Sequence, residues 1–282
     1  MESIPEFSGH LFLQAEARAD GRTVLAAQSF RAPFHLSKPH WDPDTRTLLV
    51  QVVNPTAGIL AGDRLESQIS VGGKSALVVT PPSASRVFQM RSGEAVSRQS
   101  FAVAAGGWLE VMPEPLVPHR GSNYRQITTI DVEPGGSLFY VEQFMPGRVG
   151  HGDAWLWDRL RLELSLRLGG ELILRERFDQ TGAGLRALAE LGGSGTAACF
   201  ANAILLVPLV PQPPGAGKPA WIEQLCALHQ NGLWAGVSAL RRGSWSLRLI
   251  APDSIKLHDG LRAARAILAQ TFPYLSVDLR KL

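Results

Sequence analysis

Residues 54–65 read Asn54-Pro55-Thr56-Ala57-Gly58-Ile59-Leu60-Ala61-Gly62-Asp63-Arg64-Leu65 and separate two strand-like runs, 48–53 and 63–71. An Asn-Pro pair followed by two glycines four residues apart is typical of a loop with a fixed conformation. Each glycine can adopt a positive φ or let another backbone segment approach closely. The stretch therefore predicts an ordered loop. The plainer alternative is a long hairpin loop in which Asp63 caps backbone amides.

The first two-thirds of the chain consist of short apolar or alternating runs separated by Gly, Pro, Asn and Asp, which is typical of a mainly β protein. The expected strands are 11–17, 23–30, 48–53, 76–79, 96–103, 127–132 and 137–141. Leucines then occupy every second position from Leu160 to Leu168, with polar residues between them. This period of two, followed by Gly169-Gly170, predicts one hairpin over residues 158–178.

The C-terminal third has a different pattern. Residues 181–191 fit a short helix or an ordered loop, 196–207 and 245–250 fit strands, and 208–219 form a Pro-rich loop. Apolar residues recur at helical spacing over 221–229 and 254–270, the second run with Asp253 or Ser254 as its N-cap. The sequence thus predicts one domain over 1–282, with a strand-rich part at 8–210 and a part containing two helices at 220–282.

Charge and composition argue against several classes of protein. The net charge is only +3, from 28 Lys+Arg against 25 Asp+Glu, and no basic run is present, so we expect no nucleic-acid partner. No apolar run reaches the roughly 18–20 residues that span a bilayer, so we expect no membrane partner. The N-terminus lacks the features of a signal peptide, and two cysteines make no disulfide framework. A cytoplasmic protein is the expectation.

Several motifs in order along the chain resemble those of the urease accessory protein D family. Residues 54–65 are similar to its Pro-Gly-Gly and Gly-Gly-Asp-Arg-Leu signature, with Ala57-Gly58 and Ala61-Gly62 in place of the Gly-Gly pairs. Further similarity lies in 21–23, 31–39, 80–88 and 109–115, and in Glu142, Gly147-Arg148 and Gly152-Asp153.

The resemblance implies a fold and a function. The fold would be a two-sheet, β-helix-like stack of strands, and the function non-enzymatic help in urease maturation. The implied partners are the urease apoprotein, accessory protein F and, through F, the GTPase accessory protein G. No cofactor would be bound tightly, and Ni²⁺ would pass transiently along or through the chain. The motif residues carried over are Asn54, Pro55, Gly58, Gly62, Asp63, Arg64, Gly147, Arg148 and Gly152.

The resemblance implies work beside nickel, so side chains that could bind this ion are of interest. Imidazole and carboxylate groups bind divalent nickel, and the best local group is His151 with Asp153, near Glu142. A weak, transient metal site is one hypothesis, and a plain surface turn is the alternative. A guanidinium binds a carboxylate in a bidentate pair, so we also expect Arg148 to meet Asp63, Glu142 or Asp153.

Two other functions stay open at this point. One is a small-molecule hydrolase that uses Glu142 and Asp153 as an acid–base pair, although the chain has no Gly-x-Ser-x-Gly elbow, P-loop or His-Glu-x-x-His motif. The other is a β-rich binding module recruited to a different complex. Trp155 and Trp157 are either core residues or interface anchors, and the same choice applies to Trp41 and Trp234.

Overall fold

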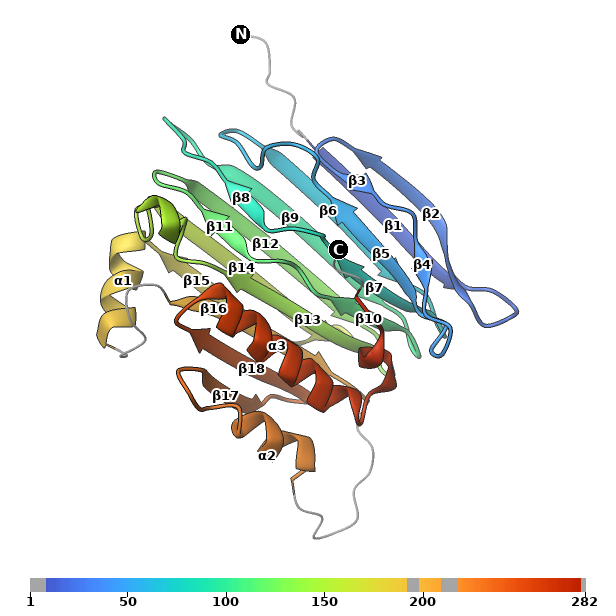
Figure 1. The fold of residues 1–282 in the computed structure, drawn as a ribbon. Helices are drawn as coiled ribbons and strands as arrows, with labels where there is room; N and C mark the ends of the chain where they lie inside the picture. The colour runs from blue at the N-terminus through green and yellow to red at the C-terminus, as the bar shows by residue number, and fades with distance from the viewer. Residues whose placement is uncertain (1–8, 192–197, 209–217, 280–282) are drawn as a thin grey trace.

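The structure, a computed structural model, describes residues 9–191, 198–208 and 218–279, in which strands are the predominant secondary structure (Figure 1). The strands are β1 (Gly9–Ala17), β2 (Thr23–Arg31), β3 (His35–Leu36), β4 (His40–Trp41), β5 (Leu48–Val53), β6 (Arg64–Val71), β7 (Ala76–Thr80), β8 (Ser85–Val87), β9 (Ala95–Val103), β10 (Trp108–Val111), β11 (Leu116–Pro118), β12 (Asn123–Val132), β13 (Ser137–Phe144), β14 (Arg159–Leu168), β15 (Glu171–Gln180), β16 (Cys199–Leu206), β17 (Trp234–Ala239) and β18 (Ser244–Ala251). The helices are α1 (Gly182–Leu191), α2 (Ala220–Cys226) and α3 (Ser254–Ala269), with 3-10 turns η1 (Val149–His151) and η2 (Pro273–Ser276).

The strands form two mixed sheets. The seven-stranded sheet has the order β15-β14-β12-β9-β6-β1-β2, and its five central strands run parallel. The eleven-stranded sheet has the order β17-β18-β16-β13-β10-β7-β5-β3, with β4, β8 and β11 paired beside this path. Its middle strands β5, β7, β10 and β13 are parallel, and β16, β18 and β17 continue it in antiparallel fashion.

Between β5 and β14 the chain passes repeatedly from one sheet to the other and back, which makes this part a β-solenoid. Successive coils are β5–β6, β7–β9, β10–β12 and β13–β14. Each coil adds one strand to the main path of each sheet, and the short strands β8 and β11 lie beside this path. The expectation of a mainly β, two-sheet architecture of stacked strands is therefore confirmed. Leucine, isoleucine and valine side chains from both inner faces fill the space between the sheets, including Leu13, Leu77, Leu109 and Ile130.

At one rim of the solenoid the coils are closed by tight turns, which we call the turn rim. These turns span 71–76, 103–108 and 132–137, and each range begins with a valine and contains glycine. They stack directly: Lys74 N–H donates to the Gly106 carbonyl at 3.2 Å, and Gly106 N–H to the Gly135 carbonyl at 3.0 Å. The coils share these short turns, but the loops at the other rim differ in length from coil to coil. The sequence therefore shows no repeat of fixed length.

At the opposite rim the coils are joined by longer segments, which we call the loop rim. They span 54–63, 81–94, 112–122 and 145–158. Here β8 pairs with β11, and Ile59 forms a bridge to Val87, so that neighbouring loops are tied together. The motif residues lie on this rim.

Helices α2 and α3 pack on the outer face of the eleven-stranded sheet (Figure 1). Their apolar sides, with Trp221, Leu225, Leu257 and Leu261, cover the outward side chains of β10, β13, β16 and β18. The fully buried carboxylate of Glu110 on β10 accepts hydrogen bonds from Arg265 of α3 at 2.7 and 3.1 Å. A buried carboxylate requires such a partner, and the ion pair fixes α3 on the sheet.

The predictions for the C-terminal third are confirmed in outline. The expected helices at 221–229 and 254–270 are α2 and α3, and Asp253 is the N-cap of α3, accepting from Lys256 N–H at 2.8 Å. The open alternative at 181–191 resolves into a further helix, α1, so the described part of the chain has one helix more than the two expected. The hairpin expected over 158–178 is β14 and β15. That 1–282 form one domain stays a prediction.

Most of the Pro-rich loop expected at 208–219, and the start of the strand expected at 196–207, lie outside the described residues. Within the described ranges, every helix falls short of the length and apolarity that crossing a bilayer requires.

Candidate functional site

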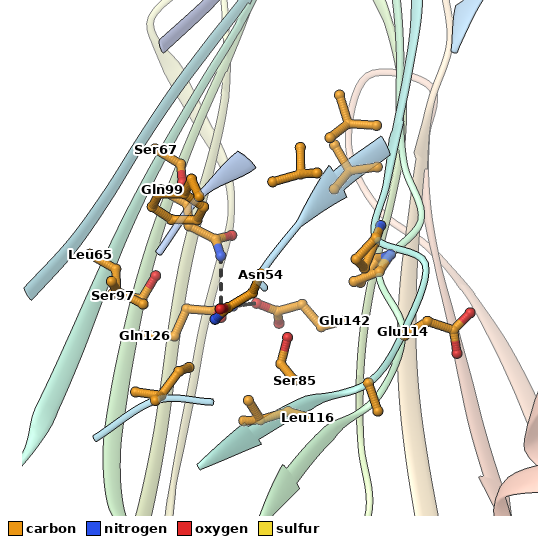
Figure 2. Close-up of a pocket in the computed structure, with 18 of the residues that line it drawn as sticks. Asn54, Leu65, Ser67, Ser85, Ser97, Gln99, Glu114, Leu116, Gln126 and Glu142 are labelled. Carbon is orange, nitrogen blue, oxygen red and sulfur yellow. Dashed lines mark hydrogen bonds between the residues drawn. The ribbon is translucent and has the colours of Figure 1, made fainter. Parts of the chain in front are cut away.

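A cavity of about 320 Å³ lies between the two sheets, next to the loop rim (Figure 2). Its apolar wall includes Leu65, Leu116 and Phe101. Its polar lining comes from both sheets and from the long loops, and consists of Asn54, Thr56, Ser67, Ser83, Ser85, Arg86, Ser97, Gln99, Glu114, Gln126, Tyr140, Glu142 and Gln143. Oxygen atoms dominate this lining, and most of them belong to neutral groups.

Glu142 on β13 extends into the centre of this cavity (Figure 2). Its Oε1 accepts hydrogen bonds from Gln126 Nε2 at 2.9 Å and from the Tyr140 hydroxyl at 3.0 Å. Burial, assisted by the negative charge of Glu176, raises the pKa of Glu142 to about 7, although the two hydrogen bonds act in the opposite direction. A neutral and an ionised form of this carboxyl group thus coexist near physiological pH.

Loop 54–63 forms one wall of the cavity in the conformation that its sequence predicts. Asn54 Oδ1 accepts from the Thr56 N–H at 3.0 Å and from the Thr56 hydroxyl at 2.6 Å, which starts the turn. Gly58 has φ +149°, and a Cβ there would lie 2.6 Å from the carbonyl oxygen of Arg86. Gly62 has φ +83°, in the left-handed region. Asp63 Oδ2 accepts from the Leu60 N–H at 2.8 Å, so the capping role considered for Asp63 is confirmed.

Arg148 and Asp153 close the last long loop upon itself. Asp153 is buried, and its Oδ2 accepts from Arg148 Nε at 2.9 Å and from Nη2 at 2.5 Å, while Oδ1 accepts from the Arg148 N–H at 2.9 Å. Burial opposes ionisation of Asp153, but these hydrogen bonds outweigh it and lower the pKa of the carboxyl group. Of the three candidate acids, Asp153 is thus the partner of Arg148, while Asp63 accepts from the Leu60 N–H and Glu142 lies in the cavity.

The rest of this loop is shaped by glycine. Gly147 has φ +131° and lies against the backbone of Asp153 and Pro118. The lack of a side chain therefore allows these backbone segments to approach closely. Gly152 has φ +68° and ends η1 in a left-handed conformation. His151 belongs to η1 and is exposed. Arg64 is the first residue of β6, and Pro55 is exposed in the first loop.

The structure does not gather Glu142, His151 and Asp153 around one point. Glu142 lies in the cavity, Asp153 is held by Arg148 outside the cavity lining, and His151 is on the surface. Across the described ranges, no three His, Cys, Asp or Glu side chains are placed to hold a metal ion together. The pair of Glu142 and Asp153 that the hydrolase hypothesis requires is not formed either, because Glu142 lines the cavity and Asp153 does not.

Several cavity residues were not expected from the sequence, namely Ser97, Gln99, Gln126, Tyr140 and Gln143. One feature of the sequence could have indicated the cavity, namely polar residues on the inner face of a strand. Gln126 and Thr128 of β12 occupy inner-face positions, at which apolar side chains are normally found. Trp155 and Trp157 are buried in the cluster beneath the loop rim, which confirms the core alternative for both. Trp41 is exposed and Trp234 half-buried, so the choice for them stays open.

Comparison with known proteins identifies the family of the chain over most of its length. A family profile described as UreD urease accessory protein matches residues 8–278. The chain is 59% identical over 278 residues to a urease accessory protein UreD of Opitutus terrae, covering 98% of this chain and 100% of that protein. It is 32% identical over 215 residues to a urease accessory protein UreD 2 of Brucella ovis, covering 73% and 71%, and 32% identical over 206 residues to a UreD of Yersinia pseudotuberculosis, covering 71% and 64%.

The match extends over both sheets and over α2 and α3, and it includes every motif residue described above. The hydrolase and the unrelated binding module are thereby set aside. The chain belongs to the UreD urease accessory protein family and is a non-catalytic urease maturation factor.

Proposed function

We propose that this chain is a cytoplasmic scaffold that binds the urease apoprotein and accessory protein F, and reaches the GTPase accessory protein G through F. Ni²⁺ passes through it on the way to the urease active site. Family membership supports the partners. The inter-sheet cavity with Glu142 at its centre supports the passage of the ion.

The chemistry of the cavity suits transient binding. A Ni²⁺ ion beside Glu142 would meet that carboxylate and a set of neutral oxygen atoms, among them those of Asn54, Ser97 and Gln99, while the second carboxylate of the lining, Glu114, lies elsewhere on its wall (Figure 2). A site with so few charged ligands holds a divalent ion weakly, since tight sites need several anionic or imidazole ligands on a rigid frame. Protons compete for the same carboxylate near pH 7, because the pKa of Glu142 is about 7. Weak binding permits release to the next partner.

The other two candidate ligands have separate roles in this proposal. Asp153 is occupied by Arg148, so it shapes the loop rim and is not a ligand for the ion. His151 is exposed on the loop rim and is available for a first contact with the ion or with a partner protein. Asn54, Gly58, Gly62 and Asp63 keep the first loop in place as a wall of the cavity.

The test is co-expression of urease and the other accessory proteins with variants of this chain, followed by measurement of nickel in the purified urease. Glu142→Gln removes the carboxylate and keeps the shape, and it lowers nickel content at least about tenfold, the order of loss that follows removal of one group around a metal. Glu223→Gln on the exposed side of α2 is the matched control and leaves nickel content unchanged.

Full nickel loading of urease in the absence of this chain would overturn the whole proposal. Full loading with Glu142→Gln, when the control also loads fully, would overturn the role of the cavity alone.

A further inference from the structure

A row of polar side chains continues from the cavity toward the neighbouring strands of the eleven-stranded sheet. Glu142 of β13 lies opposite Asn202 of β16, and Asn202 lies opposite Arg248 of β18. Directly opposite residues of adjacent strands point to the same face of a sheet, and their Cα atoms are about 5 Å apart. Glu142, Asn202 and Arg248 therefore form one row on the inner face, and the row leads away from the loops that line the cavity.

The opposite sheet contributes one carboxylate to this row, from Glu176 of β15. Arg248 Nη2 donates to its Oε1 at 2.5 Å, and Asn202 Nδ2 donates to its Oε2 at 2.5 Å. Ser246 in turn donates to Asn202 Oδ1 at 3.2 Å. The Glu176 side chain is 20% exposed and that of Arg248 is 68% exposed, so Arg248 stands at the outer end of the row.

The two carboxylates of the row influence each other. The negative charge of Glu176 is one of the contributions that disfavour ionisation of Glu142. Such repulsion is relieved by any positive charge near either group. In the structure this charge is the guanidinium of Arg248, which neutralises Glu176 but lies on the side away from Glu142.

We infer that Arg248 is a tethered counter-cation, which occupies Glu176 and competes with a divalent metal ion for that carboxylate. This inference rests on the proposed function, since it concerns the same ion in the adjoining cavity. While Arg248 is paired, an ion at Glu142 does not have the Glu176 carboxylate as a further anionic ligand, and its binding stays weak. When the exposed arginine side chain swings away, Glu176 becomes available and the row is open to solvent at this end.

A purely structural role would be a tie between the two sheets, since β15 and β18 belong to different sheets. Both roles predict that loss of Arg248 changes stability. Only competition for Glu176 predicts that loss of Arg248 strengthens metal binding, and that removal of the Glu176 charge then cancels the gain.

The experiment is titration of the purified full-length chain with Ni²⁺ alone by isothermal calorimetry, above pH 7. Arg248→Met keeps the length of the side chain and removes its charge, and we expect Ni²⁺ affinity to rise about tenfold or more, because a competing unit charge is lost from a partly buried carboxylate. Arg248→Lys keeps the charge and binds as the unmodified chain does. The double variant Arg248→Met with Glu176→Gln returns to the original affinity.

Unchanged affinity in Arg248→Met would overturn the inference, as would a gain that persists in the double variant. Denaturation of all variants in parallel shows whether each is folded at the temperature of titration. Glu142→Gln separates this inference from the proposed function. If that variant loses Ni²⁺ binding while Arg248→Met binds normally, the cavity proposal stands and the role of Arg248 falls. If Glu142→Gln binds normally, the cavity proposal falls.

Discussion

The two rims of the solenoid join the same strands in opposite ways. At the turn rim, segments such as 103–108 reverse the chain in a few residues, and their backbones hydrogen-bond directly from coil to coil. At the loop rim, each connection is longer, carries short strands such as β8 and β11, and borders the cavity. The difference shows that closure of the coils needs only one rim, which leaves the other free to carry the residues that function requires.

The largest expected effect comes from a side chain placed in a stacked turn. A Cβ at Gly107 would lie 2.9 Å from the Gly72 carbonyl oxygen and 3.0 Å from that of Ala104, and neither backbone group can move without disturbing the next coil. We expect Gly107→Val to lower the free energy of unfolding by about 3 kcal/mol, measured by chemical denaturation.

The same substitution at the loop rim is the matched control. Nothing lies within 4 Å of a Cβ at Gly150. Gly150→Val is therefore expected to change stability by less than about 0.5 kcal/mol. Equal effects at the two positions would contradict the view that the turn rim alone is tightly constrained.

The next effect concerns Glu142 and depends on pH. Its folded pKa is raised from 4.5 to about 7, so the folded state retains a proton that the unfolded state has lost. The free energy of unfolding is therefore expected to fall as pH rises from about 4.5 to 7, by roughly 3 kcal/mol, and to level off above that range. Glu142→Gln removes this decline in a series of denaturation curves across pH. A decline of the same size in the variant would assign it to another group.

A smaller effect is expected from the ion pair that closes the last loop. Arg148→Ala leaves the buried Asp153 carboxylate with backbone donors only, at a cost of about 1 to 2 kcal/mol, since the arginine is itself 40% exposed. The folded pKa of Asp153 is lowered, so this stabilisation is present above its ordinary pKa of 3.8 and is lost as pH falls below it.

The comparison for this variant is Arg159→Ala, which breaks the pair with Asp179. Both partners of that pair are about half exposed, at 51% and 48%. Its loss is expected to leave stability essentially unchanged, because solvent screens an exposed pair. Denaturation at pH 7 and at pH 3 measures both variants. An effect of Arg148→Ala that is independent of pH would mean that Asp153 does not carry it.

The sequence predicts the parts of the fold that are periodic or local. Alternating leucines identify β14, and helical spacing identifies α3. Arg148 and Asp153 are only five residues apart in one loop, so the sequence could suggest their pairing. By contrast, all four residues of β10 are buried, so no alternation marks that strand, and β8 and β11 are too short to show any.

The cavity could not be predicted as a whole, because its members come from distant coils. Gln126 and Glu142 meet across the two sheets, and Asn54 reaches the same space from the first long loop (Figure 2). Nothing in the local sequence states which inner-face positions oppose each other. That relation is fixed by the stacking of the coils, which depends on the turn rim.

Stacked coils also set the dimensions of the frame in discrete steps. Each coil adds one strand to each sheet, and neighbouring strands are about 4.8 Å apart. A relative that gained or lost one coil would shift everything beyond that point by one such increment, with side chains kept on their original faces. The distance between a surface on β2 and a surface on α2 therefore changes only in steps of one strand spacing. A protein that binds both surfaces at once must have its own binding sites at that distance.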